Sequence, residues 1–105
     1  MTRVTYSNDG RVFKLGLEGH AGYDNEGKDI VCSSISTITY MLTNELLVHC
    51  DSIFCNHSLK SGDVKISAHA RNEIGMTVCE VLFNAAVRTL KGLAKMYPEN
   101  VSFTS

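Results

Sequence analysis

The chain has 105 residues, of which 44% are hydrophobic and 20% are charged, and its formal net charge at pH 7 is −1. This length accommodates one compact domain and is too short for two, so residues 1–105 are expected to form a single domain. A near-neutral charge gives no support for non-specific binding to nucleic acid, because that binding depends on lysines and arginines that neutralise phosphates. Direct contact with nucleic acid is therefore not expected.

The sequence contains no apolar run of the roughly 20 residues that span a bilayer. Residues 1–6 alternate in polarity and lack the apolar core of a signal peptide. The expected compartment is therefore the cytoplasm, without contact with a membrane. Because thiols stay reduced there, the 4 cysteines do not predict disulfides.

The first elements along the chain are two expected strands, residues 2–6 and 11–19. Asn8-Asp9-Gly10 lies between them and is a strong hairpin turn signal. In the second strand the apolar side chains Phe13, Leu15 and Leu17 share one face. This pattern predicts a hairpin with one buried face.

A helix is expected from about residue 30 to residue 49, with Asp29 as its N-cap. Apolar positions at three- and four-residue spacing predict its core stripe, which consists of Val31, Ile35, Ile38, Leu42, Leu46 and His49. Ile30, Met41 and Val48 lie nearly opposite this stripe. Such a second apolar patch indicates cover by another element or by a second subunit.

The second half of the sequence predicts another hairpin, a long helix and a short strand. Residues 53–59 and 64–69 form the expected hairpin around Ser61-Gly62-Asp63, and the helix is expected over residues 72–97. Pro98 ends this helix, and Val101 and Phe103 indicate a final strand. The resulting order is ββαββαβ, an α+β domain in which two helices pack on a mostly antiparallel sheet.

His20 and Cys32 are the side chains that indicate chemistry. His20 closes a strand, and Cys32 falls in the first turn of a helix, where unpaired N–H groups and the helix dipole favour a thiolate. A neutral imidazole can take the thiol proton and later protonate a leaving amine. The glycines Gly22 and Gly27 allow the intervening loop to bring the two residues together.

For several neighbours of this pair the sequence allows two roles. Asp29 orients His20 as a third catalytic residue or only caps the helix, and capping is favoured. The N–H groups of Cys32 and Ser33 are candidates for an oxyanion hole. Ser36 lies one turn beyond Cys32 on the same face, where it contacts substrate or the thiolate, or has no function. Tyr23 stacks on an aromatic residue of a substrate or covers the empty site.

Gly19-His20-Ala21, the spacer ending in Gly27-Lys28-Asp29 and the run Asp29-Ile30-Val31-Cys32 resemble the signature of the ribosomal-processing cysteine protease family, Prp. Ser36 also fits this pattern. The resemblance extends to chain length and to the ββαββαβ order, so it covers the whole chain. Family members commonly have a small apolar residue directly after the cysteine, whereas this chain has the nearly isosteric Ser33.

The resemblance implies a cysteine endopeptidase in which Cys32 is the nucleophile and His20 the general base. The implied substrate is the N-terminal extension of a large-subunit ribosomal protein, and the implied assembly is a homodimer. The loop containing Gly22, Tyr23 and Gly27 is implied to be mobile until substrate binds. No metal and no cofactor are expected.

Two functions of other classes remain as alternatives: a non-catalytic ribosome-assembly module and a redox-sensing thiol protein. The first predicts binding without cleavage, and the second requires a resolving cysteine near Cys32. A zinc site formed by His49, Cys50, Cys55 and His57 is disfavoured, since their spacing matches no CxxC pairing. Cys79 is expected in the core and His69 on a solvent-facing strand.

Overall fold

The computed structural model describes residues 1–25 and 27–104. Glu26 of the predicted loop and Ser105, the last residue of the predicted domain, lie outside the described residues. The elements follow in the order β1 (Thr2–Asn8), β2 (Val12–Glu18), α1 (Ile30–Val48), β3 (Ile53–Lys60), β4 (Asp63–Ala70), α2 (Glu73–Met96) and β5 (Val101–Thr104). This confirms the predicted ββαββαβ order and the α+β class.

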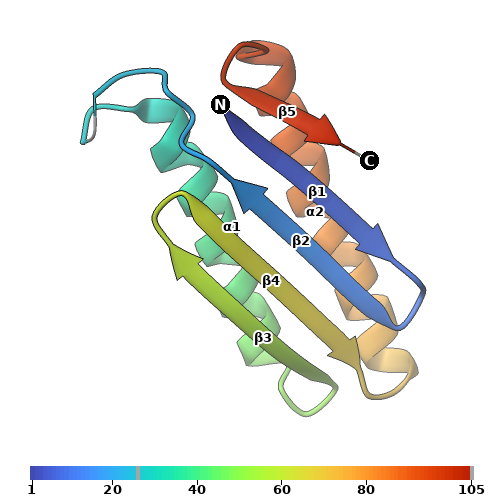
Figure 1. Cartoon of the computed structure of the whole chain (residues 1–105). Helices are drawn as coiled ribbons and strands as arrows, with labels where there is room; N and C mark the ends of the chain where they lie inside the picture. Colours follow the sequence, from blue (N-terminus) through green and yellow to red (C-terminus); the bar gives the residue numbers. More distant parts are fainter. Residues whose placement is uncertain (26, 105) are drawn as a thin grey trace.

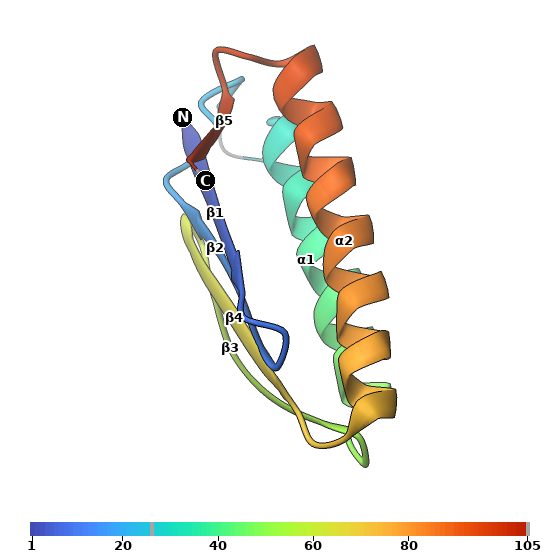
Figure 2. The same cartoon turned by 90° about the vertical axis from the view of Figure 1, so that its right-hand side faces the viewer.

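The strands form one five-stranded sheet in the order β3-β4-β2-β1-β5 (Figure 1). All neighbours are antiparallel except β1 and β5, which run parallel. Figure 2 shows α1 and α2 side by side on one face of the sheet. The sheet therefore brings β2 between β1 and β4, an order that the sequence pattern did not predict.

The β1–β2 turn forms as its residues predict. The Asp9 side chain accepts hydrogen bonds from the N–H groups of Arg11 and Val12 at 3.0 and 2.8 Å. Gly10 has a φ of +92°, a conformation that side chains disfavour. The turn sets the register that places Val4 opposite Leu17, and both side chains are buried.

The core lies between the sheet and the two helices. Phe83 of α2 is fully buried and its ring lies against the rings of Phe13 and Tyr6, with centroids 5.5 and 6.0 Å apart. Cys79 is also fully buried, as predicted, and burial raises the pKa of its thiol to about 11. His69 is exposed on β4, as expected.

The stripe predicted on α1 is largely confirmed. Val31, Ile35, Leu42 and Leu46 are buried, and Ile38 is half-buried. His49 does not continue the stripe: it is the C-cap residue and is only half-buried, because the helix ends at Val48.

Two threonines occupy core positions on α1 that the apolar pattern did not indicate. Thr39 and Thr43 are buried, and their hydroxyls donate hydrogen bonds to the carbonyl groups of Ser36 and Thr39, one turn back. These bonds satisfy the hydroxyls, so their burial carries no cost of an unpaired polar group.

The second apolar patch of α1 is exposed in this structure. Ile30, Met41 and Val48 have exposed fractions of 53%, 41% and 71%. No element of the described chain covers them. No helix in the described residues is long and apolar enough to cross a membrane.

Candidate active site

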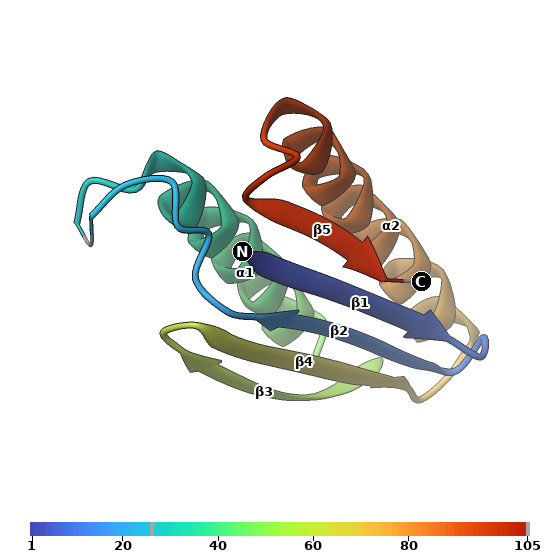
Figure 3. The same ribbon diagram turned by 45° about the horizontal axis from the view of Figure 1, so that its top comes forward.

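His20 and Cys32 lie at one end of the sheet, where β2 ends and α1 begins. His20 follows β2 after one intervening residue, and its side chain is exposed. Cys32 is the third residue of α1 and is half-buried. The segment after β2 runs beyond the end of the sheet before the chain returns to α1 (Figure 3).

Asp29 fixes the start of α1 through bonds to backbone N–H groups. Its Oδ1 accepts from Val31 and Cys32 at 3.0 and 2.9 Å, which makes it the predicted N-cap. Its Oδ2 accepts from Tyr23 and, at 3.4 Å, from Asp24. Burial by itself raises the pKa of this carboxyl. The hydrogen bonds lower the pKa by more than burial raises it, so the pKa lies below its usual value of 3.8.

These bonds also bear on the two roles considered for the first turn. Among the described residues the Asp29 carboxylate accepts no hydrogen bond from a histidine, so the geometry is that of a cap. The Cys32 N–H donates to Asp29 Oδ1, and the Ser33 N–H donates to the Asp29 carbonyl at 3.1 Å. Both N–H groups therefore have partners within the chain in this structure, one in the cap and one in the first backbone bond of the helix, and their role as an oxyanion hole stays a prediction.

A different backbone group contacts the thiol. The N–H of Ala21 donates to Cys32 Sγ at 3.3 Å, within the range of hydrogen bonds to sulfur. The carbonyl of Ala21 accepts from the side-chain amide of Asn100 at 3.0 Å, and Ala21 is almost fully buried. Ala21, which directly follows His20, is thus held between Cys32 and the C-terminal segment.

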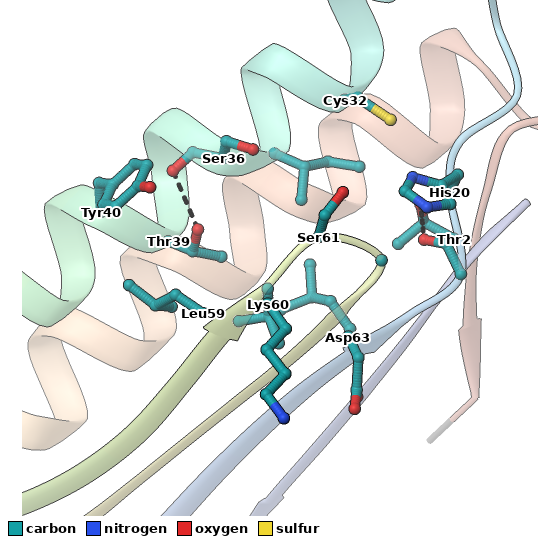
Figure 4. Close-up of a pocket in the computed structure, with 15 residues that line it drawn as sticks. Thr2, His20, Cys32, Ser36, Thr39, Tyr40, Leu59, Lys60, Ser61 and Asp63 are labelled. Atoms are coloured by element: carbon teal, nitrogen blue, oxygen red, sulfur yellow. Dashed lines mark hydrogen bonds between the residues drawn. The ribbon is translucent and has the colours of Figure 1, made fainter. Parts of the chain in front are cut away.

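Two hollows meet at the histidine and the cysteine. One, the sheet-side hollow of about 290 Å³, is lined by residues of the sheet and α1, among them the apolar Leu17, Ile35 and Leu59 and the polar Lys60 and Asp63. The other, the loop-side hollow of about 490 Å³, is lined by residues of the loop and of the first turns of α1, such as Asp24 and Lys28. Four residues line both hollows: His20, Cys32, Ser36 and Ser61. Figure 4 shows these side chains approaching the sheet-side hollow from α1, from the end of β2 and from the β3–β4 turn.

Of the other residues proposed for the site, some line one of the hollows and one does not. Gly22, Gly27 and Ser33 line the loop-side hollow, and the Ser33 hydroxyl donates to the Ile30 carbonyl at 3.1 Å. Tyr23 lines neither hollow. Its ring packs edge-on against Tyr97 with centroids 5.3 Å apart, and its contact with a substrate stays a prediction.

Sequence reasoning missed three residues at the site: Ser61, Gly62 and Asn100. The first two belong to the β3–β4 turn, which pairing of Glu18 with Asp63 brings to the end of β2. Asn100 is separated from its partner Ala21 by 79 residues. No local signal marks any of them, since a turn serine, a turn glycine and an asparagine after a helix are common features of loops.

No metal centre accompanies this site in the described residues. Across residues 1–25 and 27–104, no group of three or more His, Cys, Asp or Glu side chains is arranged to hold a metal ion. His49, Cys50, Cys55 and His57, all within these ranges, form no such group.

Residues 1–102 match the model of the Peptidase_Prp family, described as cysteine protease Prp. The chain belongs to this family. It is therefore a cysteine protease, and the resemblance noted in its His–Cys motif is confirmed at the level of the family. Comparison of this chain with curated proteins gives no significant match.

Solved structures show the same fold. An essential ribosomal processing protease Prp from S. aureus, with a covalently linked product peptide, has a TM-score of 0.75 at 22% identity, covering 99% of this chain and 98% of that one. The S. aureus protein with a substrate peptide has a TM-score of 0.71 at 18% identity, with coverage of 98% and 95%. SMU.848 from Streptococcus mutans has a TM-score of 0.71 at 27% identity, with coverage of 99% and 92%.

Proposed function

We propose that this protease uses Cys32 as its nucleophile and His20 as its general base. The observation that carries the proposal is the hydrogen bond from the Ala21 N–H to Cys32 Sγ, because it ties the sulfur to the residue next to His20. Both side chains also line the two hollows that meet at this point. Base, thiol and space for a peptide on either side therefore occur together.

The chemistry follows from these positions. His20 takes the thiol proton, and the thiolate receives a hydrogen bond from the Ala21 N–H and the favourable field of the α1 N-terminus. The thiolate attacks the scissile carbonyl carbon, and the C–N bond breaks as the His20 imidazolium protonates the leaving amine. Water, deprotonated by His20, then hydrolyses the thioester and restores the free thiol.

The proposed substrate is the N-terminal extension of a large-subunit ribosomal protein. This proposal rests on family membership and on the likeness to a ribosomal processing protease. The sheet-side hollow, whose lining includes Leu17, Ile35 and Leu59, is the proposed site for the hydrophobic residues before the scissile bond, and the loop-side hollow the proposed site for the residues after it. We also propose a cytoplasmic homodimer, with the exposed apolar patch of α1 as a candidate contact surface.

The test is mass spectrometry of the extended ribosomal protein after incubation with the wild-type chain and with three variants. Cys32→Ala and His20→Ala should leave the extension intact. Cys50→Ala, which removes an exposed free cysteine outside the hollows, should trim it as the wild type does. Normal trimming by Cys32→Ala would overturn the proposal, and binding without trimming by the wild type would favour an assembly module.

The redox-sensor alternative finds little support in the positions of the cysteines. Cys50 lies two residues beyond the end of α1, and at about 1.5 Å of rise per residue that end is roughly 24 Å along the helix from Cys32. Cys55 lies on β3, two residues beyond its start at Ile53, near that same far end. A disulfide requires Cα atoms within about 7 Å, so Cys50 cannot serve as the resolving residue without unfolding α1.

A further inference from the structure

Gly62, in the β3–β4 turn, lies directly against the imidazole ring of His20. A Cβ atom placed on Gly62 would be 2.8 Å from His20 Nε2 and 3.1 Å from both Cδ2 and Cε1. The first of these distances is shorter than real Cβ contacts, so the ring occupies the space that any side chain at position 62 would need. The absence of a side chain at Gly62 therefore determines where the ring can lie.

The same glycine also holds the backbone beside His20. Its carbonyl accepts a hydrogen bond from the Gly19 N–H at 2.8 Å. The Gly19 carbonyl in turn accepts from the Thr2 hydroxyl at 2.9 Å. The residue before His20 is thus fixed by Gly62, while the ring of His20 fills the space beside Gly62 where a Cβ would lie.

The ring has few other restraints. His20 is exposed, and its imidazole forms no hydrogen bond with another residue in the described part of the chain. A group pressing on the ring from Gly62 would meet little resistance, since the ring can rotate into solvent. Displacement would then separate the imidazole from Cys32 without disturbing the core.

We propose that Gly62 is a positioning residue for His20: it leaves room for the imidazole to lie beside Cys32 and fixes the backbone that carries it. The proposal rests on the proposed roles of His20 and Cys32 and adds a third element, the β3–β4 turn, to the catalytic apparatus. The turn acts through the base and does not touch the reacting atoms.

The test compares Gly62→Ala with a matched variant, Gly10→Ala. Both glycines lie in hairpin turns at positive φ, +76° and +92°, so both substitutions introduce backbone strain of the same kind. A Cβ on Gly10 meets nothing within 4 Å, and Gly10 lies in the other hairpin turn, between β1 and β2. The difference between the two variants therefore isolates the contact with His20.

We expect Gly62→Ala to lower kcat for cleavage of the extended ribosomal protein by about tenfold to a hundredfold, the scale for a catalytic group misplaced by about 1 Å. KM should change little, and Gly10→Ala should keep the wild-type kcat. In histidine-labelled protein, the His20 ring resonance, assigned by its loss in His20→Ala, should shift in Gly62→Ala and stay in place in Gly10→Ala.

A double-mutant cycle supplies a readout that does not depend on cleavage. Gly62→Ala should slow the alkylation of Cys32 by iodoacetamide in the wild type and leave it unchanged in the His20→Ala background, because the base that the substitution displaces is absent there. Equal slowing in the two backgrounds, or equal kcat values for Gly62→Ala and Gly10→Ala, would overturn the role of Gly62 and leave His20 and Cys32 as proposed. Wild-type cleavage by His20→Ala would instead overturn the proposed function, and the role of Gly62 with it.

Discussion

The backbone N–H of Ala21 donates a hydrogen bond to the sulfur of Cys32 at 3.3 Å, although the two residues belong to different ends of the β2–α1 connection. Ala21 directly follows His20, so the proposed base and the donor to the thiol are carried by consecutive residues. The connection is anchored at its other end by Asp29, which binds both the loop and the first turn of α1. Any closure of the loop over a substrate therefore takes place between two fixed ends.

Asn100 should matter for activity through Ala21. Its side-chain amide donates to the Ala21 carbonyl, and Asn100→Ala removes this donor. Since one such bond contributes about 1 kcal/mol, we expect kcat to fall about fivefold to tenfold. In Asn100→Ala, the rate at which iodoacetamide alkylates Cys32, followed by mass spectrometry, should also differ from the rate in the wild type. Asn84→Ala, at an exposed position on α2, is the control, and equal rates for the two variants would contradict the prediction.

Asp29 should give the protein a pH-dependent stability. Hydrogen bonds keep its pKa in the folded state below 3.8 despite its burial, so its carboxylate stabilises the fold above that pH. This contribution is lost as pH falls through the lower folded-state pKa. Asp29→Asn keeps a capping oxygen but carries no charge, so it should lack the pH-dependent part.

Urea unfolding of the wild type and of Asp29→Asn measures this effect. The wild type should be the more stable at pH 7, and the difference should shrink as pH falls below about 4. Asp29→Ala, which loses the cap altogether, should cost about 0.5–2 kcal/mol at pH 7. A wild-type advantage over Asp29→Asn that is constant from pH 7 to pH 2 would contradict the assignment.

Two glycines of α2 should respond in opposite directions to the same substitution. A Cβ on Gly75 would collide with the Ser52 carbonyl oxygen, so Gly75→Ala must shift backbone and should cost about 1–3 kcal/mol. Gly92 lies in the same helix with nothing within 4 Å, so Gly92→Ala should add about 0.5–1 kcal/mol to the free energy of unfolding. Chemical denaturation of both variants provides the measurement, and changes of the same sign would refute the assigned packing.

Much of the fold followed from local sequence signals. Asn8-Asp9-Gly10 marked the first turn, and Asp29 marked the start of α1, because side chains of these residues bond to backbone groups only two or three positions away. The apolar spacing of α1 marked its buried face, except where Thr39 and Thr43 satisfy their hydroxyls within the helix. The His20–Cys32 motif was likewise visible, since its members are close along the chain.

The tertiary structure alone decided which distant segments meet. The place of β2 between β1 and β4 brings Gly62 to His20, and the return of the chain after α2 brings Asn100 to Ala21. It also decided that the Cys32 N–H bonds to the Asp29 side chain, and that the Cys32 sulfur accepts a hydrogen bond from the N–H of Ala21. The physical reason is that local patterns encode turns, caps and buried faces, whereas pairing across the sheet depends on packing the whole core at once.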